Sequence, residues 1–281
     1  FLIEEPTVPD QKLDLTNPAV PAPLMEGKRG LIMGVANQRS IAWGIAEILR
    51  SHGAELAFTY QGQSLGKRVI PLAESVGSEL VFDCDVNDDD SVKAVFEVLE
   101  KKWGTFDFIV HAIAYSNKDE LKGKYVNTSR ENFLMTMDIS CFSFTAIAKH
   151  AEPLLNYGGS LISLSFSGAE RVMPNYNVMG VAKAALEASV RYLAADFGSK
   201  DIRVNAISAG PMRTLAGSAI GGARDILRYS QDAAPLSREL QLQDIGGAAL
   251  YLLSDLSASV TGEVHHVDSG FSIIGMPHNR D

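Results

Sequence analysis

Short apolar runs alternate along the chain with longer stretches in which apolar residues recur at helical spacing. The runs predict buried strands at residues 30–35, 55–60, 80–83, 106–111, 160–164, 202–207 and about 264–267. The longer stretches predict helices at 40–51, from 64 with an interruption or kink near Pro71, and at 88–103, 129–155, 176–197 and 243–254. Such alternation predicts a parallel sheet with helices on both faces.

The expected fold class is therefore α/β, as one Rossmann-type, doubly wound domain of about seven strands over residues 28–281. Residues 1–27 contain five prolines and no apolar period, which predicts an N-terminal arm, either disordered or a tag or processed segment. Three glycines precede a short apolar helix within about 212–231, where we expect a small helical substrate lid.

Composition narrows the possible functions. The 281 residues are 46% hydrophobic, enough for one large core, and the formal net charge of −9 without a basic stripe argues against a nucleic-acid partner. The chain contains no apolar run of about 18 residues, so no membrane span is predicted. Cys84 and Cys141 lack ligand spacing, so we expect no metal and a reducing compartment. A bacterial cytoplasmic location is expected, with a processed organellar protein as the alternative.

A glycine turn followed by a helix start comes directly after the first predicted strand. Gly34 ends that strand, Ser40 can cap the next helix, and Ile41 begins it. Backbone N–H groups at such a helix start bind phosphate, although the close G-x-G-x-x-G spacing is missing. A tight turn without a ligand is an equally good interpretation of this segment alone.

The second and third strands end in residues that suit an adenosine. Gln61 can bond ribose hydroxyls, and no arginine at 59–61 is present to bind a 2′-phosphate, which favours NADH over NADPH. Asp85 can accept from the adenine amino group while Val86 packs on the ring. An acidic junction between strand and loop is the alternative.

Tyr176 and Lys183 are seven residues apart, so on a helix they lie within about 20° of each other, two turns apart. A nearby cation favours the phenolate, which makes the phenol a better proton donor, and the lysine can hold a sugar hydroxyl. This pair suits a reductase. A core tyrosine and a solvated lysine are the alternatives.

From about Gly30 to Met276 the chain resembles the enoyl-[acyl-carrier-protein] reductases of the divergent short-chain dehydrogenase/reductase family. The matching stretches are SIAWGIA (40–46), GAELAFTYQ (53–61), CDV (84–86), GAER (168–171), PNYNVMGVAK (174–183), RVNAISAGPMRTLA (203–216) and GEVHHVDSGF (262–271). Classical short-chain members place the lysine four residues after the tyrosine, where this chain has Gly180.

The resemblance implies that NADH delivers hydride to the β-carbon of a trans-2-enoyl thioester in type II fatty acid biosynthesis. Tyr176 would then stabilise the enolate and Lys183 would hold the nicotinamide ribose. It also implies an acyl carrier protein as partner and a homotetramer built through the helices at 129–155 and 176–197.

Further site residues follow by position in the family. Ile113 is expected against the cofactor, and Ser116 against the substrate. Phe166 stands where many members have a second tyrosine, and we expect it to form a wall of the acyl pocket. Cofactor contacts are also expected from the loop residues Met212, Arg213, Thr214, Leu215 and Ala216.

A basic rim of Arg213, Arg224 and Arg228 is a candidate docking site for an acidic carrier protein, with ordinary surface charge as the alternative. Two other functions are compatible with the fold: a carbonyl reductase or alcohol dehydrogenase, and a non-catalytic dinucleotide-binding protein. Gly180 argues against the first, and the retained Tyr176 and Lys183 argue against the second.

Overall fold

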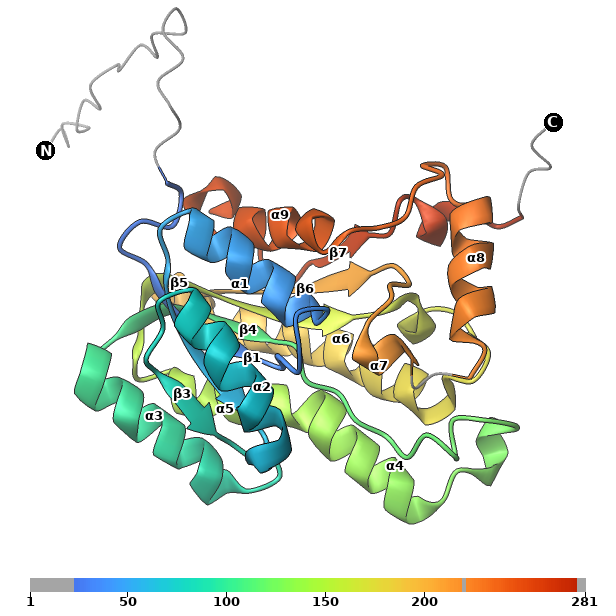
Figure 1. Cartoon of the computed structure of the whole chain (residues 1–281), viewed down its shortest axis with the longest axis horizontal. Helices are drawn as coiled ribbons and strands as arrows, with labels where there is room; N and C mark the ends of the chain where they lie inside the picture. The colour runs from blue at the N-terminus through green and yellow to red at the C-terminus, as the bar shows by residue number, and fades with distance from the viewer. Residues whose placement is uncertain (1–22, 219–220, 277–281) are drawn as a thin grey trace, which may run out of the picture.

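A single sheet of parallel strands forms the centre of the computed structural model, which describes residues 23–218 and 221–276 (Figure 1). In the described residues the strand order is β3-β2-β1-β4-β5-β6-β7, and each neighbouring pair is parallel. The strands are β1 (Arg29–Met33), β2 (Glu55–Tyr60), β3 (Val81–Asp83), β4 (Phe106–His111), β5 (Leu155–Ser165), β6 (Arg203–Ala209) and β7 (Val264–Val267). The predicted α/β class is confirmed.

Helices cover both faces of this sheet (Figure 1). One face carries α1 (Ile41–Ser51), α2 (Gly62–Ser75) and α9 (Leu242–Leu253), and the other carries α3 (Asp89–Trp103), α5 (Ser143–Ala151) and α6 (Asn177–Phe197). A hydrophobic core lies on each face of the sheet, and successive residues of a strand point into different cores because side chains alternate across a strand. Leu31 of β1 packs beneath α3 and α5, whereas its neighbour Ile32 packs beneath α1 and α9.

The predicted helix at 129–155 is wrong in its length and regularity. The segment forms α4 (Arg130–Met137), a π-helical turn η2 (Asp138–Phe142) and α5, which ends at Ala151. Leu155 instead begins β5 and pairs with Phe106, whose N–H donates to the carbonyl of Leu154. Leu154 and Leu155 are apolar and buried, a pattern that suits either element, so pairing with β4 decides the outcome.

An interruption or a kink was predicted near Pro71, and the interruption is wrong, because α2 runs unbroken from Gly62 to Ser75. Val69 and Ala73 lie on either side of the proline and are fully buried against the sheet. Packing of this face stabilises the helix despite the missing N–H of Pro71.

Residues 1–22 of the predicted arm lie outside the described part of the chain, whereas residues 23–27 belong to the fold. Met25, within the same predicted arm, is fully buried beside α1, and its N–H donates to the carbonyl of His52. No helix within residues 23–218 and 221–276 is long and apolar enough to cross a membrane.

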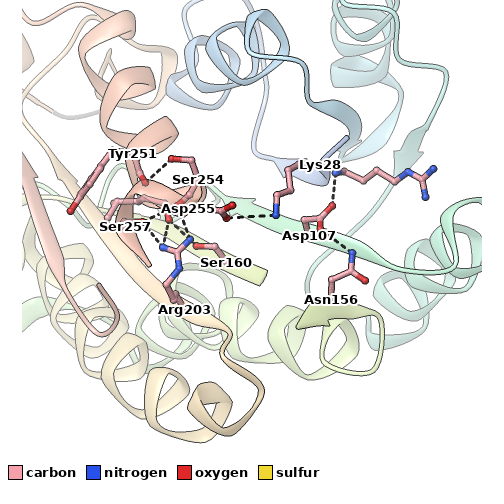
Figure 2. Close-up of polar contacts among 11 residues, drawn as sticks. Lys28, Asp107, Asn156, Ser160, Arg203, Tyr251, Ser254, Asp255 and Ser257 are labelled. Atoms are coloured by element: carbon pink, nitrogen blue, oxygen red, sulfur yellow. Dashed lines mark hydrogen bonds and ion pairs between the residues drawn. The ribbon is translucent and has the colours of Figure 1, made fainter. Parts of the chain in front are cut away.

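A polar network joins the amino-terminal ends of the strands to the end of α9 (Figure 2). Arg203 of β6 is buried and donates to the carbonyls of Leu252 and Ser254 and to the hydroxyl of Ser257. Ser160 of β5 donates to the same Leu252 carbonyl at 3.0 Å. These bonds satisfy carbonyl groups at the end of α9 and leave the opposite edge of the sheet for the site.

Candidate active site

A cavity of about 1290 Å³ opens over the carboxyl ends of the strands. It lies where β1 and β4 are neighbours and the strand order reverses, the place at which doubly wound sheets bind ligands. Most of the predicted site residues line it: Gly34, Ser40, Ile41, Gln61, Val86, Ile113, Ser116, Phe166, Tyr176, Lys183, Met212, Thr214 and Leu215. The structure therefore brings together predicted residues from the segments that follow each of the strands β1 to β6.

Two predicted residues are placed away from the cavity lining, and the side chain of a third is not described. Asp85 and Arg213 are not among the described residues that line the cavity. The Asp85 carboxylate accepts hydrogen bonds from the backbone and side chain of Asn87, and the backbone bond does most to lower the pKa of Asp85. Ala216 lies in α7 (Leu215–Ser218), and its side chain is outside the described part of the chain.

The loop between β1 and α1 is shaped by Gly34 and Ser40. Gly34 has φ +100°, and a Cβ there would lie 2.1 Å from the carbonyl oxygen of Ala112, so only glycine fits. Ser40 occupies the N-cap position of α1, but its side chain does not cap the helix. Its Oγ instead accepts from the N–H groups of Ala36 and Asn37, at 3.0 and 3.1 Å.

This arrangement corrects the predicted anion site. The loop amides of Ala36 and Asn37 are occupied by Ser40, so they are not available to a phosphate. The first amides of α1, on Ile41 and Ala42, donate to no other described residue, and both residues line the cavity. The helix start therefore retains two N–H groups for an anion, as expected at a helix N-terminus.

Tyr176 and Lys183 both line the cavity, although Tyr176 precedes the first residue of α6. Tyr176 is the N-cap of α6, with φ −112° and ψ −27°, and is 6% exposed. Its hydroxyl bonds to no other described residue. The Lys183 Nζ donates to the carbonyl of Leu164 at 2.6 Å, which fixes the ammonium at the end of β5.

The pKa of the phenol shifts in the direction opposite to the one expected from a neighbouring cation. Burial, followed by the negative charge of Glu187, raises the pKa of Tyr176 well above its usual value. Burial lowers the pKa of Lys183 to about 8. Spacing along a helix reveals a neighbouring charge but not the loss of solvent, which dominates here. Tyr176 is therefore a neutral hydroxyl that can donate a hydrogen bond.

Glu187 is a buried residue beside this cavity that the sequence analysis missed. It accepts a 2.5 Å hydrogen bond from the hydroxyl of Ser165, which lines the cavity, and burial raises the pKa of Glu187. Its position four residues after Lys183 puts it on the same helix face, so the spacing offered a signal.

Phe166 and Leu121 form an apolar surround for Tyr176. The Phe166 ring lies edge-on to the Tyr176 ring, with centroids 5.0 Å apart and an interplanar angle of 66°. Leu121 and Met179 are buried in the same cluster. Leu121 comes from an irregular loop between β4 and α4, which explains why no pattern marked it.

Helix α7 and helix α8 (Ala223–Ala233) bound the cavity where a lid was predicted. Gly217, Ala223, Ile226 and Leu227 contribute to its lining, together with Leu215. Residues 219 and 220 lie outside the described part of the chain. The N–H of Gly217 donates to the hydroxyl of Thr214 at 2.9 Å, so this hydroxyl organises the start of α7.

A doubly wound sheet with a buried tyrosine–lysine pair beside a cavity at its switch point defines the short-chain dehydrogenase/reductase class. The family profile described as Enoyl-(Acyl carrier protein) reductase matches residues 34–272. The chain therefore belongs to the enoyl-(acyl carrier protein) reductase family.

Individual relatives agree with this assignment. Enoyl-[acyl-carrier-protein] reductase [NADH] 2 of Rhizobium meliloti is 63% identical over 254 residues, which cover 90% of this chain and 95% of that protein. The crystal structure of FabI from Candidatus Liberibacter asiaticus has a TM-score of 0.89 at 56% identity, covering 91% and 99% of the two chains. The reductase of Anaplasma phagocytophilum, solved in complex with NAD, has a TM-score of 0.88 at 58% identity, covering 91% and 98%.

Proposed function

We propose that this protein is an enzyme that reduces the trans-2 double bond of enoyl thioesters carried by acyl carrier protein, with NADH, in type II fatty acid biosynthesis. The observation that carries this proposal is the hydroxyl of Tyr176, which has no hydrogen-bond partner among the described residues; Tyr176 lines the same cavity as Lys183, whose ammonium is held by the Leu164 carbonyl. The R. meliloti relative is named as an NADH-dependent enoyl-[acyl-carrier-protein] reductase, which supports the same reaction.

The residues present suit a dinucleotide. Two unbonded amides at the start of α1 suit a pyrophosphate. Gly34, in the loop before them, has no side chain that would block this group. Ile113, Gln61 and Val86 line the same cavity and would hold the remaining groups, with Lys183 on the nicotinamide ribose. When bound, NADH supplies the hydride.

The protein's own part in the reaction is to stabilise charge. The Tyr176 hydroxyl donates to the thioester oxygen, on which negative charge grows as the double bond is reduced. The apolar surround of Phe166 and Leu121 excludes water, which strengthens that hydrogen bond. Ser116 lies at the same cavity, and its hydroxyl accepts from Thr136 at 2.8 Å, so it is held in place beside the substrate.

The preference for NADH is supported by the end of β2. Gln61 lines the cavity there, and no cation occupies positions 59–61. The next basic residues along the chain, Lys67 and Arg68, lie on α2. We expect a lower KM for NADH than for NADPH, and a lower KM for NADPH would contradict this assignment.

One assay tests the main proposal. Purified protein is mixed with NADH and a trans-2-enoyl thioester, and the loss of NADH absorbance is followed; parallel reactions contain ketone substrates. We expect turnover of the enoyl thioester only. Turnover of ketones alone would make the protein a carbonyl reductase, and tight NADH binding with no turnover would make it a non-catalytic dinucleotide binder.

Carbonyl reduction is disfavoured by the environment of Gly180. A Cβ at this position would lie 2.6 Å from the carbonyl oxygen of Gly168. The lysine of the classical four-residue spacing therefore does not fit without a shift of the turn that carries Gly168.

A homotetramer in the bacterial cytoplasm is the remaining part of the proposal. Large apolar side chains are exposed on the two helical segments expected at the subunit interfaces: Leu134, Phe142 and Tyr192 are 60%, 56% and 77% exposed. Burial of such side chains between subunits is a common reason for their exposure in one chain. Light scattering on the purified protein should give four times the chain mass, and a monomer would contradict the proposal.

The segment around α7 and α8 is proposed as a substrate lid, and residues 1–22 as an arm, because Met25 is already buried in the core. Gly217 and Gly222 flank the lid's middle, and Gly222 has φ +74°. Removal of residues 1–22 should leave kcat unchanged if the arm has no part in the site.

A further inference from the structure

Tyr176 is flanked by two asparagines whose backbone is left-handed. The φ angles are +57° at Asn175 and +35° at Asn177, in a region that few residues other than glycine adopt and that asparagine tolerates. The side-chain amide of Asn177 donates to the carbonyls of Glu120 and Gly123, in the loop before α4, at 3.3 and 3.4 Å. The side chain of Asn175 bonds a different part of the chain, the segment that leads into α8.

The bond from Asn175 holds the residue directly before the cap of α8. Its side-chain amide donates to the carbonyl of Gly221 at 2.7 Å. Gly222, the next residue, is the N-cap of α8 (orange in Figure 1) and has φ +74°. Among the described residues, no other hydrogen bond joins residues 221–227 to a different part of the chain. The start of α8 is thus held by the residue that precedes Tyr176.

Packing supports the same connection. A Cβ at Gly221 would lie 3.3 Å from Cγ of Asn175, so the two segments are already in close contact. Met173 packs against the cluster that contains Tyr176 and also against the cluster around Ala233, at the other end of α8. The turn before Tyr176 therefore contacts the α8 segment near both of its ends.

The inner face of α8 is an apolar wall of the cavity. Ala223, Ile226 and Leu227 line the same cavity as Tyr176. Apolar side chains suit the hydrocarbon chain of a substrate whose thioester oxygen meets the Tyr176 hydroxyl. The position of this wall relative to the phenol depends on what holds the start of α8, and that contact is the Asn175 bond.

We propose that Asn175 is a positioning residue that fixes the α8 wall relative to the Tyr176 hydroxyl and thereby favours longer enoyl chains. The inference rests on the proposed function, because it requires an enoyl thioester at Tyr176. One hydrogen bond between neutral groups corresponds to about a fivefold change in the population of the held state. A chain that packs on the wall gains from this population, whereas a chain too short to reach the wall does not.

The test compares two chain lengths on the same small carrier. The substrates are the trans-2-octenoyl and crotonyl thioesters of N-acetylcysteamine. Asn175→Gly removes the side-chain amide and retains a residue that adopts φ +57° without strain. We expect kcat/KM for the octenoyl thioester to fall about fivefold, and kcat/KM for the crotonyl thioester to change less than about twofold. A general loss of structure would lower both values together.

Asn175→Asp tests the bond with almost no change in size. Aspartate also tolerates the left-handed region, but its carboxylate cannot donate and would face the carbonyl of Gly221. The ratio of kcat/KM for the octenoyl thioester to that for the crotonyl thioester should fall at least as far as in Asn175→Gly. A wild-type ratio in Asn175→Asp would contradict the role given to the bond.

Hydrogen exchange of the free protein provides a readout that does not depend on turnover. Loss of the Asn175 bond should speed the exchange of the amides in 221–233 about fivefold, because the start of α8 opens more often. Asn177→Gly removes the neighbouring side chain, which bonds a different loop, and should leave exchange at 221–233 at the wild-type rate.

Asp201→Gly is the matched control for a glycine at a left-handed position. Asp201 also has φ +57°, is exposed in the turn before β6, and lies outside the described lining of the cavity. This variant should keep both the wild-type ratio of kcat/KM values and the wild-type exchange at 221–233.

Distinct results would overturn each proposal. If Asn175→Gly keeps the wild-type exchange at 221–233, or lowers kcat/KM equally for the two chain lengths, the positioning inference is wrong. Equal changes in Asn177→Gly or Asp201→Gly would also overturn it, because the effect would then belong to the glycine and not to the lost bond. If the wild-type protein turns over neither thioester, the proposed function fails instead.

Discussion

The hydroxyl of Tyr176 is a hydrogen-bond donor without a protein acceptor among the described residues, and Tyr176 lines the cavity. Its removal breaks no hydrogen bond within the described part of the protein, so it should not destabilise the fold. In Tyr176→Phe we expect kcat to fall about 100-fold, because one oxyanion donor is lost, while Tm stays unchanged. Steady-state kinetics and thermal unfolding measure the two effects.

Tyr251 provides the control for this substitution. It lies half-buried on α9, outside the described lining of the cavity, so Tyr251→Phe should keep the wild-type kcat. Full activity in Tyr176→Phe would contradict the role given to the phenol.

Titration of Lys183 should make kcat/KM decrease at alkaline pH. Burial lowers the pKa of its ammonium to about 8, and the cation is the form that holds a ribose hydroxyl and donates to the Leu164 carbonyl. We expect kcat/KM to fall as pH rises through about 8, and a profile that is flat up to pH 10 would contradict this.

The lowered pKa of Lys183 should make the protein more stable as pH rises, whereas kcat/KM should fall over the same range. Between pH 8 and 10.5 the unfolded lysine still holds its proton while the folded one has lost it. The unfolded state then binds more protons, so the contribution of Lys183 to the free energy of unfolding rises with pH over this window. Lys183→Met should remove that rise, which urea unfolding at several pH values can measure.

At the residue scale, the sequence predicted which side chains line one cavity but not their environment. The seven-residue spacing brought Tyr176 and Lys183 to one cavity, although Tyr176 is not within the helix. The direction of the phenol's pKa was missed because burial arises from Leu121 and Phe166, which are distant from Tyr176 in sequence. Ser40 was placed at a helix start correctly, but its bonds to the loop amides depend on a backbone path that no pattern reveals.

At the scale of elements, α6 and the short helix η3 (Ser167–Ala169) touch through two glycines. A Cβ at Gly168 would lie 2.3 Å from Cδ1 of Tyr176, and one at Gly180 would lie 2.6 Å from the Gly168 carbonyl. This close approach sets the position of the Tyr176 ring against the end of β5. The tyrosine is thus positioned by a contact between elements and not by its rotamer alone.

Gly168→Ala should therefore impair both fold and reaction. Overpacking against the Tyr176 ring should lower the free energy of unfolding by about 1–3 kcal/mol and reduce kcat at least about tenfold. Urea unfolding and steady-state kinetics check the two effects.

Gly247→Ala is the matched control, because it lies in α9 with no atom within 4 Å of the added Cβ. It should stabilise the protein by up to about 1 kcal/mol, since alanine favours helix. If Gly168→Ala behaves like this control, the close contact has no importance for the site.

Elements were predicted well where one local pattern suffices. An apolar run marked each of the seven strands, although β5 begins at Leu155, five residues before the predicted run at 160–164. The helices from 88 to 103 and from 243 to 254 have one clear apolar face. The prediction failed between 129 and 155, where the helix is interrupted by a π-helical turn and ends early. There Ser140 bonds both the N–H and the carbonyl of Tyr115, a contact with a distant segment that periodicity cannot show.

At the scale of the whole molecule, the Arg203 network and the cavity lie at opposite edges of the sheet. Arg203 and its partners occupy the amino-terminal edge (Figure 2), and the cavity occupies the carboxyl edge. Stability and binding should therefore respond to different substitutions.

Arg203→Met tests this separation. It leaves the carbonyls of Leu252 and Ser254 without their charged donor, so the free energy of unfolding should fall by about 2–4 kcal/mol. KM for NADH should not change in the folded protein, because Arg203 lies at the opposite edge. Urea unfolding and NADH kinetics provide the two measurements.

Lys28→Gln is the comparison at the same edge. Its ion pair with Asp255 is 3.7 Å long, and the Asp255 side chain is 86% exposed, so its loss should cost under about 0.5 kcal/mol. A small effect of Arg203→Met, or a changed KM, would contradict the division of the sheet into two edges.

The contact between Gly168 and Gly180 also restricts the routes by which such a reductase can diverge. Moving the lysine from position 183 to position 180 introduces a side chain where the carbonyl of Gly168 already lies, so the turn must change at the same time. Each single substitution that moves the lysine should therefore yield a protein with impaired folding or activity. The two spacings are thus separated by an epistatic barrier, and a lineage that has adopted one of them is expected to keep it.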